Sequence, residues 1–364
     1  MKIKPKLTLA FLLASLVPLV VLGILSYTNA KETVTNGVLN QLQSVAVIQK
    51  HRIESIISQN LERLALVSSR TQLRISLDSY LKQNSITDQE RMNTILLDAR
   101  SSIEDFEEIY VLNLDGEVVA STSETMIGSS FAGEEAFMRG RAEENSGALL
   151  FLDEDEELEN YLSGPLYLEG NLIGVVVIRS NADNILSVLG DYAGMGRTGE
   201  TLLAKRNPEG DALFISPLRF YPEAELHRTM SIDNLDSPTV QALLGNEGLF
   251  TDAVDYRSEP VLAATQYIEG VDWGLVVKID RAEAFTPVTR LYNLTALTLS
   301  LTAALVVVVS LYLARSVSKP IQNLARVTDK IREGNVSQRA EITSDDEIGV
   351  LAQHFNEMTE DLGH

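Results

Sequence analysis

Two long apolar stretches constrain this chain more than any other feature of its sequence. Residues 7–30 and 291–314 contain no charged side chain, and the second is centred on Leu305-Val306-Val307-Val308-Val309. A helix that crosses a bilayer needs about 20 apolar residues. We therefore expect two transmembrane helices, at 7–30 and 291–314, with Pro18 tolerated inside the first.

A cleaved signal peptide is the alternative for the first stretch, with Thr28-Asn29-Ala30 as a possible cleavage site. Its apolar run is longer than the roughly 7–15 residues of a signal core, which favours an uncleaved anchor.

Cytoplasmic flanks of membrane helices are rich in Lys and Arg. Residues 1–6 and 315–364 are therefore expected in the cytoplasm and 31–290 outside, because basic residues flank both spans: Lys2, Lys4, Lys6, Arg315, Lys319 and Arg326.

The acidic charge of the chain lies in the segment between the two spans. The formal net charge is −21, and residues 28–290 hold 21 Lys and Arg against 42 Asp and Glu. A nucleic-acid partner is excluded because no basic footprint is present. The absence of cysteine excludes disulfides and thiolate metal sites.

The segment after the first span predicts a long helix over 31–82. Apolar residues recur there at spacings of three and four, namely Leu39, Leu42, Ala46, Ile53, Ile56, Leu64 and Val67, with Asn60 in the same series. Such a seam fits packing on a second copy of the chain or on the helix's own domain, and the pattern leaves both open.

Strand patterns dominate the rest of this segment, and part of them is repeated. Ile109–Leu112 and Glu117–Ala120 flank Leu114-Asp115-Gly116, as in a β-hairpin. Residues 167–183 match residues 267–283 without a gap, with seven of 17 positions identical. A fixed offset indicates a duplicated unit, although two unrelated hairpins would share some of this pattern. We expect a distal module at about 83–190 and a proximal module at about 191–290.

A helix followed by duplicated antiparallel strands between two membrane spans resembles the double Cache sensor family. The resemblance covers roughly residues 31–290 and includes the stretch Asp272–Asp280. It implies an α+β fold with two PAS-like sheets and a small-molecule ligand, usually in the distal module. It also implies a bacterial inner-membrane location.

The end of the chain resembles a HAMP domain over about 315–364. Pro320 is expected to open a first helix, and Asp346-Glu347-Ile348-Gly349 matches the signature that opens the second. Residues in each helix keep seam spacing; they are Ile321, Leu324, Thr328, Ile331, Ile348, Leu351, Phe355, Met358 and Leu362, and all but Thr328 are apolar. The resemblance implies a four-helix bundle from two subunits, with Pro320, Glu347 and Gly349 in the signal relay. A plain coiled coil is the alternative.

A candidate ligand site lies in the distal module. Arg139 and Arg141 occupy a segment that often lines the pocket in double Cache sensors, but they lack the Trp-Tyr partner of amino-acid-binding members. We expect a small organic anion held by Arg139, Arg141 and Arg179, with Tyr161 or Tyr167 at the wall, because guanidinium groups suit carboxylates. Surface arginines that balance nearby glutamates are the alternative.

Other candidate sites are weaker. The four histidines lack metal-ligand spacing, and no cofactor or catalytic set is expected. Gly194–Gly199 resembles a dinucleotide fingerprint, but no helical pattern opens at its end, so an inter-domain linker is expected. The acidic run 153–157 lacks the glycine and ligand spacing of a calcium loop and is expected to be solvated.

These features predict a transmembrane receptor without a catalytic domain of its own, which relays ligand binding outside to a kinase, cyclase or chemotaxis output. Whether that output belongs to a longer chain or to a separate protein is left open. The alternative is a membrane-tethered binding or adhesion protein, and the HAMP-like segment argues against it because adhesion needs no relay.

Overall fold

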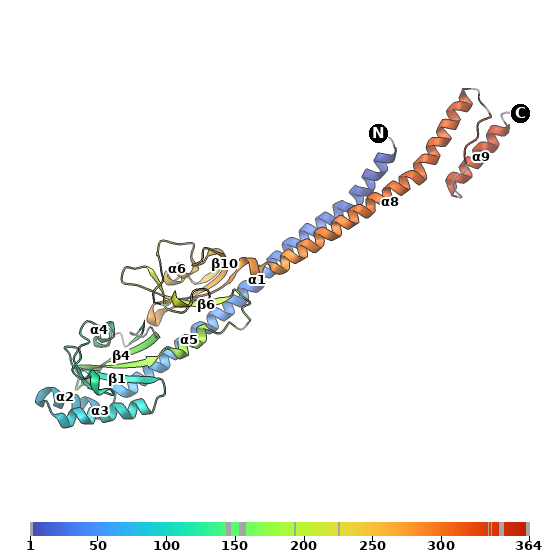
Figure 1. Cartoon of the computed structure of the whole chain (residues 1–364). Coiled ribbons are helices and arrows are strands. Elements are labelled where there is room, and N and C mark those ends of the chain that lie inside the picture. The colour runs from blue at the N-terminus through green and yellow to red at the C-terminus, as the bar shows by residue number, and fades with distance from the viewer. Residues whose placement is uncertain are drawn as a thin grey trace. The chain divides into compact units, whose positions relative to one another are not determined.

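The chain forms two units in the computed structural model, which describes residues 3–142, 147–152, 158–192, 194–224, 226–333, 335, 337–341 and 346–361 (Figure 1). The sensor unit comprises residues 35–284. The helical unit comprises residues 1–34 and 285–364. Helix α1 (Ile3–Ser68) begins in the helical unit and ends in the sensor unit.

Helices and antiparallel strands alternate along the sensor unit, and helices form the helical unit. The further helices are α2 (Thr71–Gln83), α3 (Ile86–Ser101), α4 (Glu135–Arg141), α5 (Asp183–Leu189), α6 (Pro238–Leu243), α7 (Arg281–Ala284), α8 (Thr286–Arg332) and α9 (Glu347–Asp361). The strands are β1 (Phe106–Leu112), β2 (Val118–Ser121), β3 (Gly147–Leu152), β4 (Leu158–Leu168), β5 (Asn171–Asn181), β6 (Glu200–Arg206), β7 (Ala212–Phe214), β8 (Thr229–Met230), β9 (Gly248–Val254), β10 (Pro260–Ile268) and β11 (Trp273–Asp280). The α+β prediction is confirmed.

The distal sheet has five antiparallel strands in the order β2-β1-β5-β4-β3. The predicted hairpin joins β1 to β2, and its turn contains Gly116 with φ +84°. The two-residue turn between β4 and β5 places Glu169 at φ +52° and Gly170 at φ +83°. Positive φ at both central residues matches the right-handed twist of a two-residue hairpin.

The proximal sheet repeats this arrangement with an additional edge strand. Its order is β8-β7-β6-β11-β10-β9, so that β7-β6-β11-β10-β9 corresponds to β2-β1-β5-β4-β3. The sequence repeat at residues 167–183 and 267–283 begins at the ends of β4 and β10 and continues through β5 and β11. The predicted duplication of one antiparallel module is therefore confirmed.

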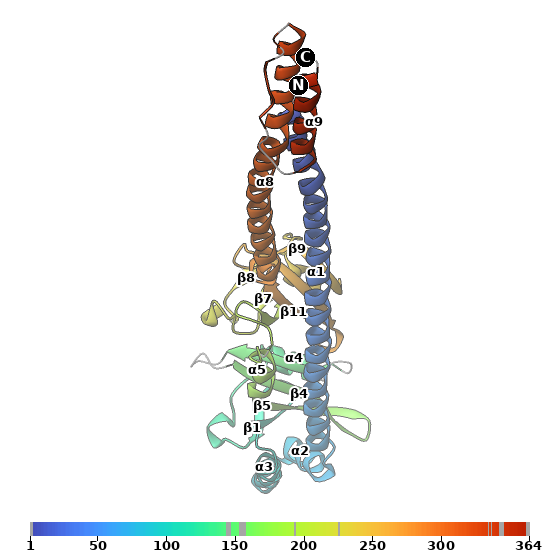
Figure 2. The same cartoon turned by 90° about the vertical axis from the view of Figure 1, so that its right-hand side faces the viewer.

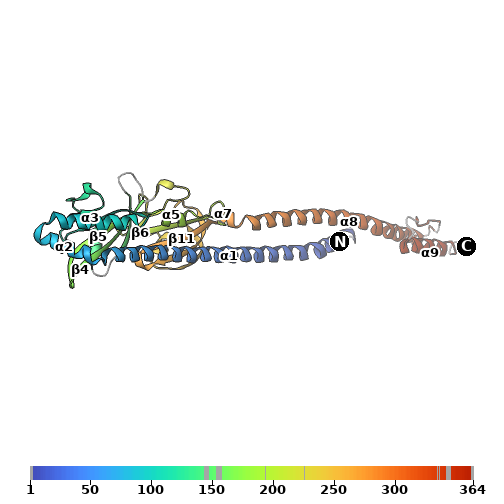
Figure 3. The same cartoon turned by 90° about the horizontal axis from the view of Figure 1, so that it is seen from below.

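The apolar seam of α1 packs on its own domain. Ile53, Ile57, Leu64 and Val67 are buried in one core that also contains residues of both sheets, namely Ile109, Val111, Leu162, Leu166, Val176, Ile178, Leu203, Trp273 and Leu275. Within the sensor unit α1 runs alongside both modules (Figures 2 and 3). Burial of each large aliphatic side chain contributes about 1.5–3 kcal/mol, so this contact fixes both modules to one helix.

The single helix expected over 31–82 is wrong, because α1 ends at Ser68 and α2 begins at Thr71. Arg70 between them has extended backbone angles, with φ −62° and ψ 107°. The break lets α2 turn so that Leu73 and Leu77 enter the core. Helix α3 was not predicted, although Ser85, which accepts a hydrogen bond from the backbone amide of Asp88, is a recognisable N-cap.

Among the residues that the structure describes, two helices are long and apolar enough to cross a membrane. Their apolar windows are 0% and 6% buried, as expected for side chains that face lipid. The first part of α1 and α8 approach each other closely in the helical unit, where a Cβ on Gly23 would lie 3.3 Å from Cγ2 of Thr295. One turn further along α1, the rings of Tyr27 and Tyr292 meet edge to face with centroids 6.0 Å apart.

Helix α8 is continuous from Thr286 to Arg332, so the helix start expected at Pro320 is wrong. Proline inside a helix removes one backbone hydrogen bond and commonly produces a kink, but it does not require the helix to end. The second relay helix is α9, and the Asp346 carboxylate caps its start by accepting hydrogen bonds from the amides of Ile348 and Gly349. The last seam residue, Leu362, lies outside the described residues.

Candidate functional site

Helix α4 packs directly on the distal sheet, on the face opposite to α1. Its Ala136 and Phe137 are buried with Tyr110, Val175 and Val177. A Cβ on Gly140 would lie 2.6 Å from Cγ1 of Val175 and 2.8 Å from Cβ of Ser163, so glycine is needed for this contact. The side chains of the sheet that share this face are candidates for the ligand site.

A cluster of charged and phenolic side chains lies on that face where β4, β5 and β1 meet. Arg179 pairs across the sheet with Tyr161 of β4 and with Glu108 of β1. Its Nη1 donates to Oε1 of Glu159 at 2.5 Å, its Nη2 lies 3.6 Å from Oε1 of Glu108, and its Nε lies 3.7 Å from Oε2 of Glu107. One guanidinium is thus surrounded by three carboxylates, and we call these four residues the Arg179 cluster.

Two phenols border the Arg179 cluster. The hydroxyl of Tyr110 donates to Glu108. Burial, and then this hydrogen bond, raises the pKa of Tyr110. Burial, and then a hydrogen bond to Glu159, raises the pKa of Tyr161. Both phenols are therefore protonated donors at physiological pH.

Several polar atoms on this face have no hydrogen-bond partner among the described residues. They are Nε of Arg179, Oδ1 of Asn181 and Oγ of Ser163. By strand alternation and register, all three project from the α4 side of the sheet. A buried polar group without a partner costs about 1–3 kcal/mol, so this face suits a ligand that supplies hydrogen-bonding groups.

The structure brings together two of the five predicted ligand-binding residues, Arg179 and Tyr161. Arg139 is 38% exposed and bonds to Glu135 one turn earlier on α4, at 2.8 Å. The side chain of Arg141 is exposed. Tyr167 lies near the far end of β4, where its backbone carbonyl accepts a hydrogen bond from Arg74. The acidic run 153–157 lies outside the described residues.

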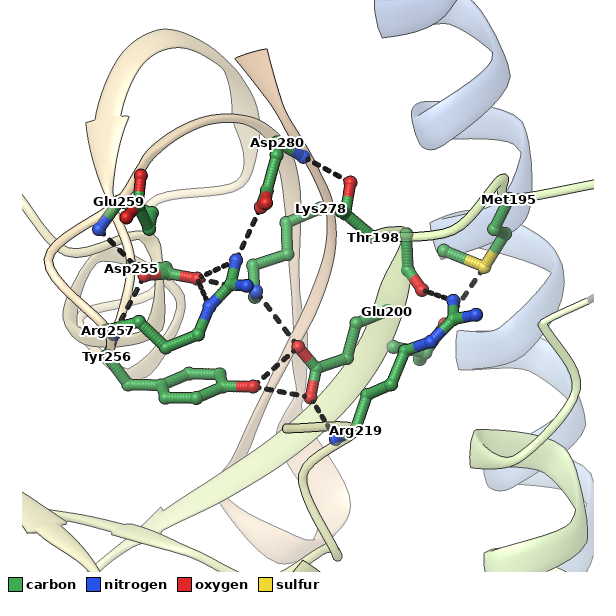
Figure 4. Close-up of polar contacts among 12 residues, drawn as sticks. Met195, Thr198, Glu200, Arg219, Asp255, Tyr256, Arg257, Glu259, Lys278 and Asp280 are labelled. Carbon is green, nitrogen blue, oxygen red and sulfur yellow. Dashed lines mark hydrogen bonds and ion pairs between the residues drawn. The ribbon is translucent and has the colours of Figure 1, made fainter. Parts of the chain in front are cut away.

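The proximal module contains a buried ionic network that the sequence analysis missed (Figure 4). Nζ of Lys278 lies 2.9 Å from Oε2 of Glu200 and 2.7 Å from Oδ2 of Asp255. The three side chains are 0%, 0% and 1% exposed. Lys278 and Glu200 are cross-strand partners on β11 and β6, so the sheet register brings them together.

Neighbouring groups satisfy the remaining acceptors of this network. The hydroxyl of Tyr256 lies 3.0 and 2.9 Å from the two carboxylate oxygens of Glu200, and the amide of Arg219 donates to Oε1 at 2.7 Å. The Arg257 guanidinium bridges Asp255 and Asp280. We call the residues Glu200, Asp255, Tyr256, Arg257, Lys278 and Asp280 the Lys278 network.

Ionisation in the Lys278 network is set by these contacts. Burial raises the pKa of Asp255, but the Lys278 ammonium and hydrogen bonds from Lys278 and Arg257 more than offset it and hold the pKa below its ordinary value. Burial, and then the charge of Glu200, raises the pKa of Tyr256. The Asp255 carboxylate is therefore charged beside Lys278 and Arg257, and the groups of the network satisfy one another's hydrogen bonds.

Two of the three predicted relay residues lie at the contact between α8 and α9. Pro320 and Gly349 line one small hollow between the two helices. Glu347 is exposed in the first turn of α9. The connector is held to α9 by two hydrogen bonds, since Oδ1 of Asn356 accepts from the amide of Ala340 at 2.7 Å and its Nδ2 donates to the carbonyl at 2.8 Å.

Together, the duplicated sheets, the two apolar helices and the paired relay helices are the elements of a membrane sensor with a helical relay. Residues 26–288 match the family model of the Cache domain, and residues 312–364 match that of the HAMP domain. The chain belongs to the Cache-domain family and carries a HAMP domain, and it is a transmembrane signalling receptor. The HAMP domain favours this function over the alternative of an adhesion protein without a relay.

Characterised relatives are receptors of two kinds. A stretch of 100 residues is 31% identical to the methyl-accepting chemotaxis protein PctB of Pseudomonas aeruginosa, covering 26% of this chain and 15% of that protein. A stretch of 134 residues is 23% identical to the sensor protein kinase WalK of Staphylococcus saprophyticus, covering 37% of this chain and 21% of that protein. The chain thus matches only a small part of the length of these relatives.

Solved sensor domains resemble the fold at low sequence identity. The sensor domain of the V. cholerae histidine kinase DctB is 14% identical with a TM-score of 0.49, covering 68% of this chain and 98% of that domain. The ligand-binding domain of the Campylobacter jejuni chemoreceptor Tlp3, solved with L-valine, is 14% identical with a TM-score of 0.48, covering 70% of this chain and 97% of that domain.

Proposed function

We propose that this receptor binds a small ligand with a positively charged group, such as an amine, on the α4 side of its distal sheet. The observation that carries the proposal is the charge of the Arg179 cluster, in which Glu107, Glu108 and Glu159 surround a single guanidinium. Three carboxylates against one cation leave a net negative charge. A ligand cation is favoured beside such a group of carboxylates.

The unpartnered groups on the same face support this ligand class. Oδ1 of Asn181 is a buried acceptor, and Oγ of Ser163 can accept as well. An ammonium group carries three donors and no acceptor. The anion predicted at Arg139, Arg141 and Arg179 remains a prediction, and the charge of the Arg179 cluster argues against it.

We also propose how binding is relayed. The sensor would lie outside the bacterial inner membrane and both termini inside, because the basic residues flank the spans on the terminal sides. Two copies would join through their HAMP domains, since Leu351 and Met358 on the seam of α9 are 55% and 51% exposed in one chain. The chain would pass its signal to a kinase, cyclase or chemotaxis output.

The ligand proposal is tested by thermal shift of the full chain in lipid nanodiscs, against matched amines, amino acids and carboxylic acids. A ligand at 100 times its Kd stabilises the folded state by about 2.7 kcal/mol, which is a measurable shift. We expect shifts with cationic compounds in the wild type, loss of these shifts in Glu159→Gln, and unchanged shifts in the Arg139→Ala, Arg141→Ala double variant.

Two results would refute the proposed ligand class. Shifts with carboxylic acids that disappear in the Arg139→Ala, Arg141→Ala variant would establish the anion site instead. Cationic compounds that bind equally well to Glu159→Gln and to the wild type would remove the Arg179 cluster from the site.

A further inference from the structure

The glycine-rich loop between the two modules has a defined structure. Residues 194–199 connect α5 to β6, as expected for a linker, and Gly194 and Gly196 have φ of +76° and +71°. These angles lie in the left-handed region that glycine adopts without strain. The loop therefore has a shape set by its glycines.

This shape directs the donors of the loop at one carboxylate. The amide of Arg197 donates to Oε1 of Glu283 at 2.9 Å, and the amide of Thr198 donates to Oε2 at 2.8 Å. The Thr198 hydroxyl donates to the same Oε2 at 2.6 Å. A Cβ on Gly196 would lie 2.7 Å from Oε1 of Glu283, so a side chain at this position would collide with the carboxylate.

The loop also contacts the elements that lead to both membrane helices. Nε2 of Gln41 on α1 donates to the carbonyl of Gly194 at 2.8 Å. Glu283 belongs to α7, and α8 begins three residues later, at Thr286. The Thr198 hydroxyl accepts from the amide of Asp280 at 3.1 Å, at the end of β11 (Figure 4).

From these contacts we infer that Glu283 is a positioning residue that ties the linker between the two modules to the start of α8. A displacement of the distal module at the end of α5 would then reach α8 through the loop and the carboxylate. Hydrogen bonds to a charged acceptor are stronger than neutral ones, and three donors converge here. This role does not depend on the class of ligand that the distal module binds.

Ionisation of Glu283 is consistent with this geometry. Partial burial raises its pKa, but the hydrogen bonds from Arg197 and Thr198 more than offset it and hold the pKa below the ordinary value. The carboxylate is therefore charged at neutral pH.

Hydrogen–deuterium exchange of the full chain in nanodiscs, without added ligand, tests this inference. Loss of a hydrogen bond to a charged group corresponds to roughly 10- to 100-fold faster exchange. We expect this acceleration in Glu283→Ala, both at residues 197 and 198 and at residues 285–290. Thr198→Val removes only the hydroxyl donor. The backbone amides of residues 197 and 198 still bond to Glu283, so we expect a smaller acceleration at the same two places.

Two further variants serve as controls. Thr198→Ser keeps the hydroxyl and should exchange like the wild type. Arg197→Ala should behave nearly like the wild type. It removes only a 93% exposed side chain whose Nε lies 3.9 Å from Oε1 of Glu283, and it keeps the backbone amide that donates to the same oxygen. Acceleration in Arg197→Ala equal to that in Glu283→Ala would contradict the inferred contact.

The decisive comparison is between the loop and the start of α8. Faster exchange at 197 and 198 with unchanged exchange at 285–290 would overturn the inference, because the contact would then be purely local. Peptides from β10 and β11 report whether the proximal sheet remains folded. If Glu283→Ala also loosens that sheet, Thr198→Val is compared with Thr198→Ser instead. Faster exchange at 285–290 in Thr198→Val alone supports the inference, and faster exchange confined to 197 and 198 overturns it.

Discussion

Removal of the positive charge at Lys278 should destabilise the sensor unit severely. The change Lys278→Met keeps most of the side-chain volume but leaves Glu200 and Asp255 as buried carboxylates that have lost their shared cation. Breaking a buried ion pair by removing one partner costs about 3–5 kcal/mol. For a unit of this size each kcal/mol corresponds to about 2–4 °C in Tm, so a decrease of roughly 6–20 °C is expected.

The assay is thermal and urea unfolding of the full chain in nanodiscs, followed by the fluorescence of Trp273, the chain's single tryptophan, which is buried in the core of the sensor unit. The matched control is Lys82→Met, whose ammonium pairs with Asp78 on the surface of α2 and is 69% exposed. Exposed pairs of this kind contribute about 0.3–0.5 kcal/mol, so the control should unfold nearly like the wild type.

A second variant separates loss of charge balance from loss of packing. Lys278→Met combined with Glu200→Gln and Asp255→Asn removes all three buried charges and should recover much of the lost stability. Equal stability of Lys278→Met and Lys82→Met would refute the reasoning, because it would mean that the buried carboxylates do not need the ammonium.

Three further predictions concern other contacts. The folded-state pKa of Asp255 lies below its ordinary value of 3.8, so its contribution to stability is complete above about pH 4 and is lost as the pH falls through the folded pKa. Urea unfolding midpoints should therefore decrease as the pH is lowered through this range, and Asp255→Asn should reduce that decrease. Gly140→Ala should cost about 1–3 kcal/mol by forcing α4 away from Ser163, measured as a lower Tm, and an unchanged Tm would contradict the close contact. Asn356→Leu should release the connector at Ala340 and make it more sensitive to limited proteolysis, since two hydrogen bonds of about 1 kcal/mol each are lost; equal cleavage rates would show that these bonds do not hold it.

Local patterns were sufficient to predict most of the architecture. Uncharged apolar runs, a repeat with a fixed offset and the Asp346–Gly349 signature are all visible within short windows of sequence. The same reasoning failed at Ser68–Arg70 and at Pro320, where one helix ends without a strong breaker and another continues through a proline. At Ser68–Arg70 the packing of α2 on the core decides where the first helix ends, and a short window does not contain that packing. At Pro320 a proline alone does not require the helix to end.

The candidate sites were only partly predictable for a related reason. Arg179 and Tyr161 were predicted as site residues and are neighbours in the sheet, but the glutamates around Arg179 come from β1 and β4 and meet it only in the folded sheet. Lys278 gave one local signal, because it interrupts a buried strand of valines and isoleucine. Its partners Glu200 and Asp255 lie far away in sequence, and no spacing rule connects them.

The continuity of α8 fixes an angular relation between its first residues and the part of the helix that belongs to the HAMP domain. A helix of 47 residues is about 70 Å long, and each residue turns it by about 100°. Insertion of one residue between the membrane span and Pro320 would therefore rotate every later side chain of α8 by about 100° relative to Thr286, whereas seven residues would restore the original direction to within about 20°. The number of residues in this segment therefore sets the direction in which the HAMP side chains of α8 point.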